Sequence, residues 1–182
     1  MVKAKSAYSI PTKSGKLDTH IFVVWVDNEA GVLARVVGLF SGRGYNIESL
    51  AVAEVDQAKN ISRITIVTTG TPQVIDQIKL QLKKLVPVHK VADFKREDKN
   101  VIFKEMALFK FVANNKKLIS ALNACRNYNP VVLDQTKKSQ VIQITALRRE
   151  IDKMSKNLTK FGLVSVSRTG AVAMTRGSEI FK

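Results

Sequence analysis

The sequence feature that most constrains the fold is a short apolar run followed at once by a helical pattern. His20–Val26 is nearly all apolar and has the length of a strand that is buried on both faces. From Ala30 to about Ser41, apolar residues recur at helical spacing on one face, namely Val32, Leu33, Val36, Val37 and Phe40. A buried strand that leads directly into an amphipathic helix predicts a domain in which helices pack on a sheet.

The junction Asp27–Arg35 predicts a helix N-terminus with an accessible backbone. Asp27 or Asn28 is expected to cap it, because a short polar side chain accepts hydrogen bonds from the free N–H groups of the first turn. Gly31 is expected inside that turn, where glycine costs roughly 1 kcal/mol relative to alanine. One interpretation is that a carboxylate or phosphate approaches the backbone there, favoured by the helix dipole. The alternative is that Gly31 lets the helix pack tightly on a neighbouring strand.

The rest of the first half completes a β-α-β-β-α-β order. Further strands are expected at Asn46–Val55, Ile61–Thr69 and Val86–Phe94. The polar segment Asp56–Asn60 is a short connection, Thr71 and Pro72 begin a second helix, and Pro87 blocks its continuation. This order, over about 75 residues, predicts a ferredoxin-like unit with a four-stranded sheet and both helices on one face.

The same order recurs after a charge-rich linker at residues 96–100. Strands are expected at Val101–Ala113, Pro130–Gln135, Gln140–Leu147 and Gly162–Ser167, and helices at Asn115–Cys125 and Arg149–Phe161. In the first of these helices Leu118, Ile119 and Leu122 are expected to face inward. We therefore predict an α+β fold of two ferredoxin-like units in tandem, residues 20–95 and 101–182. Residues 1–19 are expected to be a flexible extension.

The expected sheets have exposed edges and one uncovered face. Unpaired strand edges in native proteins are usually paired or blunted, and two units joined side by side would pair them. The pattern therefore predicts a homo-oligomer, in which a small ligand could be clamped between subunits near the helix-opening loop.

The formal net charge of +15 is concentrated in the second half, since residues 1–19 carry +3, residues 20–95 carry +2 and residues 96–182 carry +10. The basic residues are scattered lysines, and no helix-turn-helix, RNA-recognition or zinc-finger motif occurs. Nucleic acid is therefore not the expected partner. A solvated surface or an acidic protein partner explains the charge better.

The single cysteine, Cys125, excludes an intramolecular disulfide and a cysteine-based zinc site, and it is expected to be a small core residue. The longest apolar run, Ile21–Val26, is far shorter than the roughly 20 residues of a membrane span. Residues 1–19 lack the apolar core of a secretory signal, although an organellar transit peptide stays open as an alternative. The expected location is the cytoplasm, with no membrane partner.

Candidate catalytic residues are few. His20 and His89 are the only histidines, and neither has Cys or Asp residues at metal-ligand spacing. No nucleophile elbow, phosphate-binding loop or dinucleotide-binding motif occurs. Ser167–Gly170 is either a turn or an anion-binding segment. We assign no catalytic residue and no metal ligand, because nothing assembles a nucleophile, a base and an oxyanion hole.

The continuous segment Asp27–Leu50 closely resembles the start of the small regulatory subunit of acetolactate synthase (acetohydroxyacid synthase), a family that contains an ACT domain. Within it, Arg43–Leu50 (Arg-Gly-Tyr-Asn-Ile-Glu-Ser-Leu) distinguishes this family from other ACT domains. The resemblance continues at Ser62–Val67 and Gln77–Leu85 and returns at Val166–Gly170 and Thr175–Gly177. It covers about residues 20–180, and it implies that the first unit is an ACT domain.

The resemblance implies a non-catalytic subunit in valine, leucine and isoleucine biosynthesis. Such a subunit dimerises through its ACT domains, binds valine or another branched-chain amino acid at their interface, and activates a separate catalytic subunit while making it sensitive to feedback inhibition. Thiamine diphosphate, Mg and FAD are expected on that catalytic subunit and no cofactor on this chain. The implied effector-binding residues are Asn28, Glu29, Ala30, Gly31, Val32 and Leu33 of one subunit, with Asn46 and Ile47 contributed across the interface.

The resemblance is weakest at Asn114–Asn129 and Thr136–Ser139, which are richer in lysine than the family pattern. This departure concerns the surface that docks on the catalytic subunit, for which Asp56–Asn60 is one candidate. The alternative function is a free-standing amino-acid-sensing ACT protein, such as a transcriptional regulator. A stand-alone enzyme is the least supported function because no catalytic constellation is visible.

Overall fold

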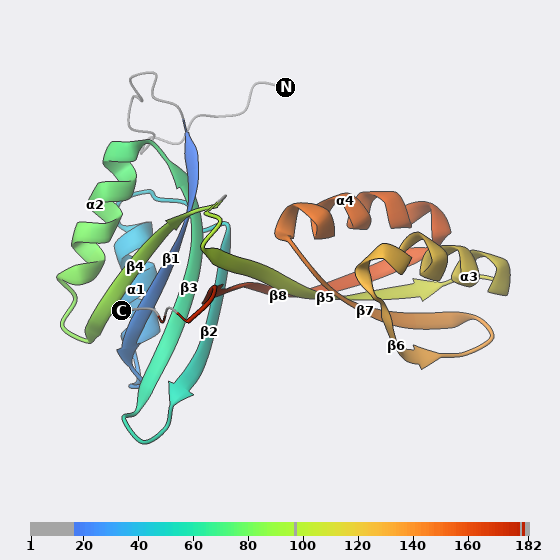
Figure 1. Ribbon diagram of the computed structural model, residues 1–182, viewed down its shortest axis with the longest axis horizontal. Helices are drawn as coiled ribbons and strands as arrows, with labels where there is room; N and C mark the ends of the chain where they lie inside the picture. The colour runs from blue at the N-terminus through green and yellow to red at the C-terminus, as the bar shows by residue number, and fades with distance from the viewer. Residues whose placement is uncertain (1–16, 97, 179, 181–182) are drawn as a thin grey trace. The chain divides into compact units, whose positions relative to one another are not determined.

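The computed structural model describes residues 17–96, 98–178 and 180, which form two compact units (Figure 1). The first unit contains the chain up to Ile102 and the residues from Ala173 onward, and the second unit is Phe103–Val172. The expected flexible extension, residues 1–19, lies mostly outside the described residues. Its last two residues, Asp18 and Thr19, belong to the first strand rather than to an extension.

The first unit has the predicted β-α-β-β-α-β order. Its elements are β1 (Asp18–Asp27), α1 (Val32–Ser41), β2 (Ser49–Asp56), β3 (Ile61–Gly70), α2 (Pro72–Lys83) and β4 (Val88–Lys95). The strands form one antiparallel sheet in the order β2-β3-β1-β4, so β2 and β4 are its edges. Both helices lie on the same face of this sheet (Figure 1). The predicted ferredoxin-like arrangement is confirmed.

The core of the first unit lies between the sheet and the helices. Phe22, Val24 and Val26 alternate along β1 and pack in the same cluster as residues of α1 and α2. Ile21 and Val23 point to the opposite face, yet they are only 3% and 0% exposed. The expectation that one sheet face is uncovered is therefore wrong at the centre of this sheet.

The buried face of α1 differs from the predicted one. Val32, Val36, Leu39 and Phe40 are buried, whereas Leu33 is 40% exposed. Positions i, i+4, i+7 and i+8 define the buried stripe, and Leu33 lies about 100° around the helix from Val32, at the edge of that stripe. The next helix starts as predicted, because the Thr71 hydroxyl accepts a hydrogen bond from the Val74 N–H and Pro72 is the first helical residue.

The second unit repeats the order. Its elements are β5 (Val101–Val112), α3 (Asn115–Ala124), the short 3-10 helix η1 (Arg126–Tyr128), β6 (Val131–Gln135), β7 (Ser139–Ala146), α4 (Arg148–Leu158), the 3-10 helix η2 (Thr159–Phe161) and β8 (Leu163–Thr175). The sheet order is β6-β7-β5-β8, and α3 and α4 lie on one face of it (Figure 1). Two ferredoxin-like units in tandem are therefore confirmed.

Two details of the second unit correct the sequence-based expectations, and a third confirms one. The last strand continues to Thr175 rather than ending at Ser167, so Ser167–Gly170 is neither a turn nor a loop. In α3, Leu118 is buried as predicted, but Ile119 is 52% exposed and Ala121 takes the inward position. Cys125 is fully buried in the core, as predicted.

No helix among the described residues has both the length and the apolar character that crossing a membrane requires.

Candidate effector-binding loop

The loop between β1 and α1, residues 28–31, is tied to the connection between β2 and β3. The Asn28 N–H donates to the Asn60 carbonyl at 2.7 Å, and the Asn60 side-chain amide donates back to the Asn28 carbonyl at 3.3 Å. The Ser62 hydroxyl donates to Oδ1 of Asn28 at 2.9 Å. Asn60 itself has a φ of 53°, a left-handed conformation that Asn tolerates better than most residues. The hairpin therefore fixes where the loop begins.

Gly31 is the residue that turns the chain into α1. It occupies the N-cap position with a φ of +85°, and no side chain caps the helix there. The prediction that Asp27 or Asn28 caps α1 is wrong, because Oδ1 of Asp27 lies 2.5 Å from Nε2 of His89 and Asn28 accepts from Ser62. The predicted position of Gly31 inside the first turn is wrong as well. A left-handed φ explains the glycine, since other residues pay a steric penalty there.

The space beside Gly31 is open. A Cβ built on Gly31 would have no described atom within 4 Å, so tight packing on a neighbouring strand does not explain the glycine in this chain. The loop residues 28–31 are all exposed. The N–H groups of Leu33 and Ala34 have no backbone or side-chain acceptor among the described residues. Unsatisfied N–H groups at a helix start attract a carboxylate or another anion.

The charges around the loop are few. α1 carries no acidic residue in its first turn, so its own side chains do not neutralise the positive end of the helix dipole. Glu29 lies in the loop, and its backbone carbonyl accepts from the Val32 N–H at 3.3 Å. Of the two aliphatic site residues at the start of α1, Val32 is 3% exposed and belongs to the core, whereas Leu33 is accessible. Leu33 is therefore the aliphatic side chain that a ligand can meet.

Asn46 and Ile47 lie at the other end of α1 from this loop. The Asn46 carbonyl accepts from Thr68, and Thr68 pairs with His20 near the start of β1. The loop is instead held by Ser62, which pairs with Val26 near the end of β1. The ten residues of α1 separate the two places by about 15 Å. One chain therefore does not bring Asn46 and Ile47 to the loop. Residues 46–48 also precede β2 rather than forming its first residues, as had been expected.

The other sequence-based candidates have structural partners. His20 Nδ1 lies 2.6 Å from Oδ1 of Asp93, and Lys79 lies 3.7 Å from the other oxygen of that carboxylate. Arg168, in the segment considered for anion binding, is paired with Glu105 and Asp152. In the described part of the chain, no three His, Cys, Asp or Glu side chains gather where they could hold a metal ion.

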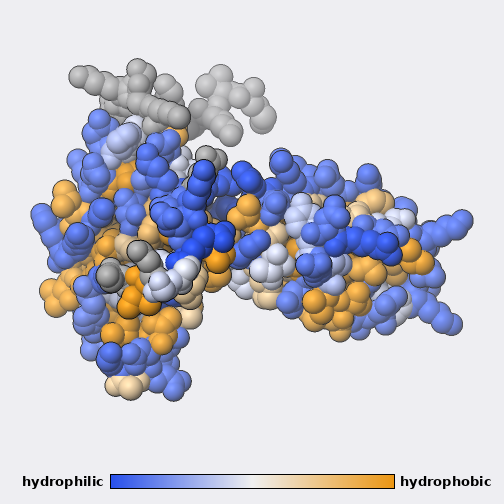
Figure 2. All heavy atoms as spheres, viewed as in Figure 1, coloured by the Kyte–Doolittle hydropathy of each residue, from blue (hydrophilic) through white to orange (hydrophobic). Residues whose placement is uncertain are grey.

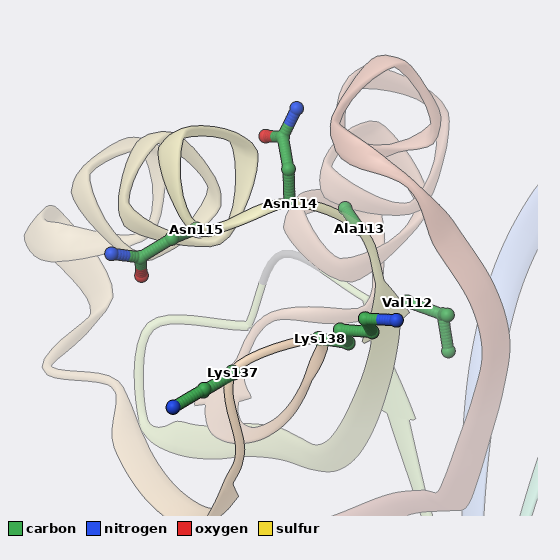
Figure 3. Close-up of a pocket in the computed structure, with 6 residues that line it drawn as sticks. All are labelled: Val112, Ala113, Asn114, Asn115, Lys137 and Lys138. Carbon is green, nitrogen blue, oxygen red and sulfur yellow. The ribbon is translucent and has the colours of Figure 1, made fainter.

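A separate pocket of about 400 Å³ lies in the second unit. It is lined by Val112, Ala113, Asn114, Asn115, Lys137 and Lys138 (Figure 3). Five of these six residues are exposed, so the pocket is a shallow surface hollow. Asn114 points away from it and uses its side chain to cap α3. The loop at Gly31, with its free N–H groups, is the better-formed candidate site.

Sequence reasoning missed Asn60 and Ser62, which position the loop without belonging to it. The only local signal was the polar connection Asp56–Asn60, which marks a turn but does not say what the turn contacts. The Asp27–His89 and Arg168–Glu105 pairs were missed for the same reason, since their partners lie 62 and 63 residues apart.

Two family models match the chain, one in each unit. The model described as "AHAS small subunit-like ACT domain" matches residues 22–90, and the model described as "Small subunit of acetolactate synthase" matches residues 104–177.

Individual proteins agree with these family matches. The chain is 36% identical over 169 residues to an acetolactate synthase small subunit of Aquifex aeolicus, covering 92% of this chain and 86% of that one. It is 35% identical over 159 residues to one of Mycobacterium bovis, covering 87% and 93%. The crystal structure of an acetolactate synthase small subunit from Thermotoga maritima superimposes with a TM-score of 0.78 at 31% identity, covering 88% of this chain and 99% of that one.

Proposed function

We propose a regulatory function from the premise that this chain belongs to the acetolactate synthase small subunit family, as its two family matches and its relatives establish. The chain is the non-catalytic subunit of that enzyme. In our proposal it binds a separate catalytic subunit in the cytoplasm, activates it, and makes it sensitive to feedback inhibition by valine. The thiamine diphosphate, Mg and FAD that the chemistry requires are carried by the catalytic subunit.

The observation that carries the effector proposal is the open, uncapped start of α1 at Gly31. In our proposal the carboxylate of valine lies on the free N–H groups of Leu33 and Ala34, where the helix dipole favours it. Asn28, Glu29 and Ala30 border the site, and the amide of Asn28 is oriented by Ser62. Leu33 offers an aliphatic contact for the isopropyl group, while Val32 supports the site from the core. Burial of that group contributes roughly 1.5–3 kcal/mol.

The second half of the effector site comes from a partner subunit in this proposal. The edge strand β2 is exposed from Val52 to Val55, and Val52 and Val55 are 43% and 45% exposed. If two copies pair antiparallel along β2, the residues that precede β2 in one copy lie beside the end of β2 in the other. That end borders the loop at Asn28, through Asn60. Asn46 and Ile47 of one subunit would then complete the site of its partner.

The experiment is a calorimetric titration of the full chain with valine, with leucine and isoleucine as comparators. Gly31→Asp and Gly31→Asn are compared, because both side chains tolerate a left-handed φ and only aspartate adds a carboxylate. Gly38→Asp adds the same charge to the open side of α1 further along the helix and serves as the control. The site is supported if three results are found together. The wild type and Gly38→Asp bind valine, and the affinity of Gly31→Asp is at least about tenfold lower than that of Gly31→Asn.

Each contrary result points to a different part of the proposal. If the wild type binds none of the three amino acids, effector sensing by this chain is wrong. If the wild type binds and Gly31→Asp binds equally well, the amino acid lies elsewhere on the protein. A specific DNA complex with no effect on the catalytic subunit would favour the free-standing regulator instead.

A further inference from the structure

The second unit carries a large cationic surplus that its own carboxylates do not neutralise. Residues 103–172 contain thirteen Lys and Arg and only four Asp and Glu. Glu105 and Asp152 both pair with Arg168, and Glu150 accepts from the Leu147 N–H at the start of α4. The remaining carboxylate, Asp134, lies on β6. Most of the cations therefore have no opposite charge of the unit to pair with.

Three of these cations form one stripe on the exposed face of α4. Ile151, Met154 and Leu158 bury the inner face of the helix, and Arg149, Lys153 and Lys156 are exposed. At 3.6 residues per turn these three fall within a sector of about 60° and span about 10 Å of helix. None of the three makes an ion pair with a carboxylate in the described part of the chain. Figure 2 shows mostly hydrophilic residues over α4. Lys160 extends the row into η2, where it lies 5.0 Å from the ring of Phe161.

The chemistry of this stripe favours an acidic protein surface as its occupant. Single-stranded nucleic acid is a poor occupant, because its bases stack on exposed aromatic side chains. None of the aromatic residues in Phe103–Val172 is exposed. A second copy of the stripe is excluded because like charges would face each other. Carboxylates of a folded protein can approach a cationic row on a helix without any stacking, and they gain most through faster encounter.

We propose that the α4 stripe, defined as Arg149, Lys153 and Lys156, docks on a carboxylate-rich surface of the catalytic subunit. This inference rests on the proposed function and adds a docking surface in the second unit. The α4 stripe does not belong to either of the segments that resemble the family least, Asn114–Asn129 and Thr136–Ser139. It is also distinct from the candidate contact at Asp56–Asn60. It also gives the basic second half of the chain a role.

The test compares two charge-neutralising pairs in the full chain. Lys153→Gln/Lys156→Gln removes two charges from the stripe with little change in helix propensity. Lys104→Gln/Lys110→Gln removes two charges from exposed positions of β5, which alternate with Ala107 and Phe109 and so lie on the opposite sheet face. Association with the immobilised catalytic subunit is measured at about 50 mM and about 500 mM NaCl. Binding of a random-sequence DNA duplex is measured in parallel.

The expected result is an association rate about tenfold lower for the stripe pair at low salt, with the difference lost at high salt. The β5 pair is expected to stay within about twofold of the wild type. Equal slowing by both pairs would overturn the inference, since net charge alone would then account for it. Normal association of the stripe pair, or a stripe-dependent loss confined to DNA, would also overturn it. If the wild type itself does not bind the catalytic subunit, the proposed function fails and the stripe inference with it.

Discussion

Arg168 on β8 and Glu105 on β5 form a two-pronged ion pair, with Nε and Nη2 of the guanidinium 2.6 and 2.8 Å from the two carboxylate oxygens. Glu105 is 2% exposed, and Nη1 of Arg168 reaches Asp152 on α4 at 2.6 Å. These bonds raise the pKa of Arg168 above its usual value, chiefly through the hydrogen bond to Glu105. The pair therefore ties the helix layer of the second unit to its sheet.

Arg168→Met is expected to lower the free energy of unfolding by about 3–5 kcal/mol, because it leaves the Glu105 carboxylate buried without its main partner. Glu105→Gln/Arg168→Met is expected to cost less than Arg168→Met alone, since no buried charge is then unpaired. Urea denaturation of the three proteins measures both differences. A double variant that is no more stable than Arg168→Met would show that the buried charge is not the cause.

The buried thiol of Cys125 predicts a loss of stability at alkaline pH. Burial raises its pKa from 9.0 to about 11. Between these two values the unfolded chain has lost the thiol proton and the folded chain has kept it, so stability falls as pH rises. The contribution of this group is present below pH 9 and decreases by about 2–3 kcal/mol by pH 11. Melting temperatures of the wild type and of Cys125→Ala are compared between pH 9 and pH 11. The fall in stability over this range should be smaller in Cys125→Ala, because the variant has no thiol to ionise. An unchanged decrease would contradict the assignment.

Ser62→Ala tests whether the hairpin positions the effector loop. The change removes the hydroxyl that donates to Asn28, and the exposed Asn28 side chain can then bond to water, so we expect a stability loss of only about 1 kcal/mol. Valine affinity should fall several-fold, because the loop is less well ordered before binding. Ser120→Ala removes a similar hydroxyl hydrogen bond, to the Lys116 carbonyl in α3, and should leave valine affinity unchanged. Equal effects of both variants on affinity would rule out a specific role of Ser62.

Val52→Lys tests the proposed dimer. A charge at this exposed edge position opposes strand pairing and should weaken the dimer. Sedimentation should therefore show dissociation at a higher protein concentration than for the wild type. Valine binding should weaken together with the dimer, since Asn46 and Ile47 come from the partner in our proposal. Leu80→Lys adds the same charge at a more exposed position, on α2, and should alter neither property. A monomeric variant that still binds valine normally would show that one chain forms the site alone.

The order of strands and helices could be predicted from the sequence because it depends on local periodicity. The nearly continuous apolar run His20–Val26 indicates a strand buried on both faces, and the helical stripe at Ile75, Ile78 and Leu82 indicates which face of α2 is buried. Boundaries were less accurate where tertiary pairing decides them. The last strand reaches Thr175 rather than Ser167, and no residue between them signals that it pairs with the neighbouring strand β5.

The residues of the candidate site were named from the sequence, but the geometry of the loop was not predicted. Gly31 was expected inside the first turn of the helix, and the structure places it at the helix start with a left-handed φ, which cannot be distinguished in sequence from a glycine that allows close packing. Leu33 was expected to face the core and is instead accessible, because the observed stripe is centred between Val32 and Val36 and Leu33 lies at its edge. Asn60 and Ser62 could not be identified, since their contacts with Asn28 join residues more than 30 positions apart.

The most direct test of the regulatory function is the rate of acetolactate formation by the catalytic subunit, measured with and without this chain and with increasing valine. The account predicts no activity of this chain alone, stimulation of the catalytic subunit when the two are mixed, and inhibition of the mixture by valine that is weakened in Gly31→Asp. A catalytic rate that this chain does not change, at any valine concentration, would contradict the account.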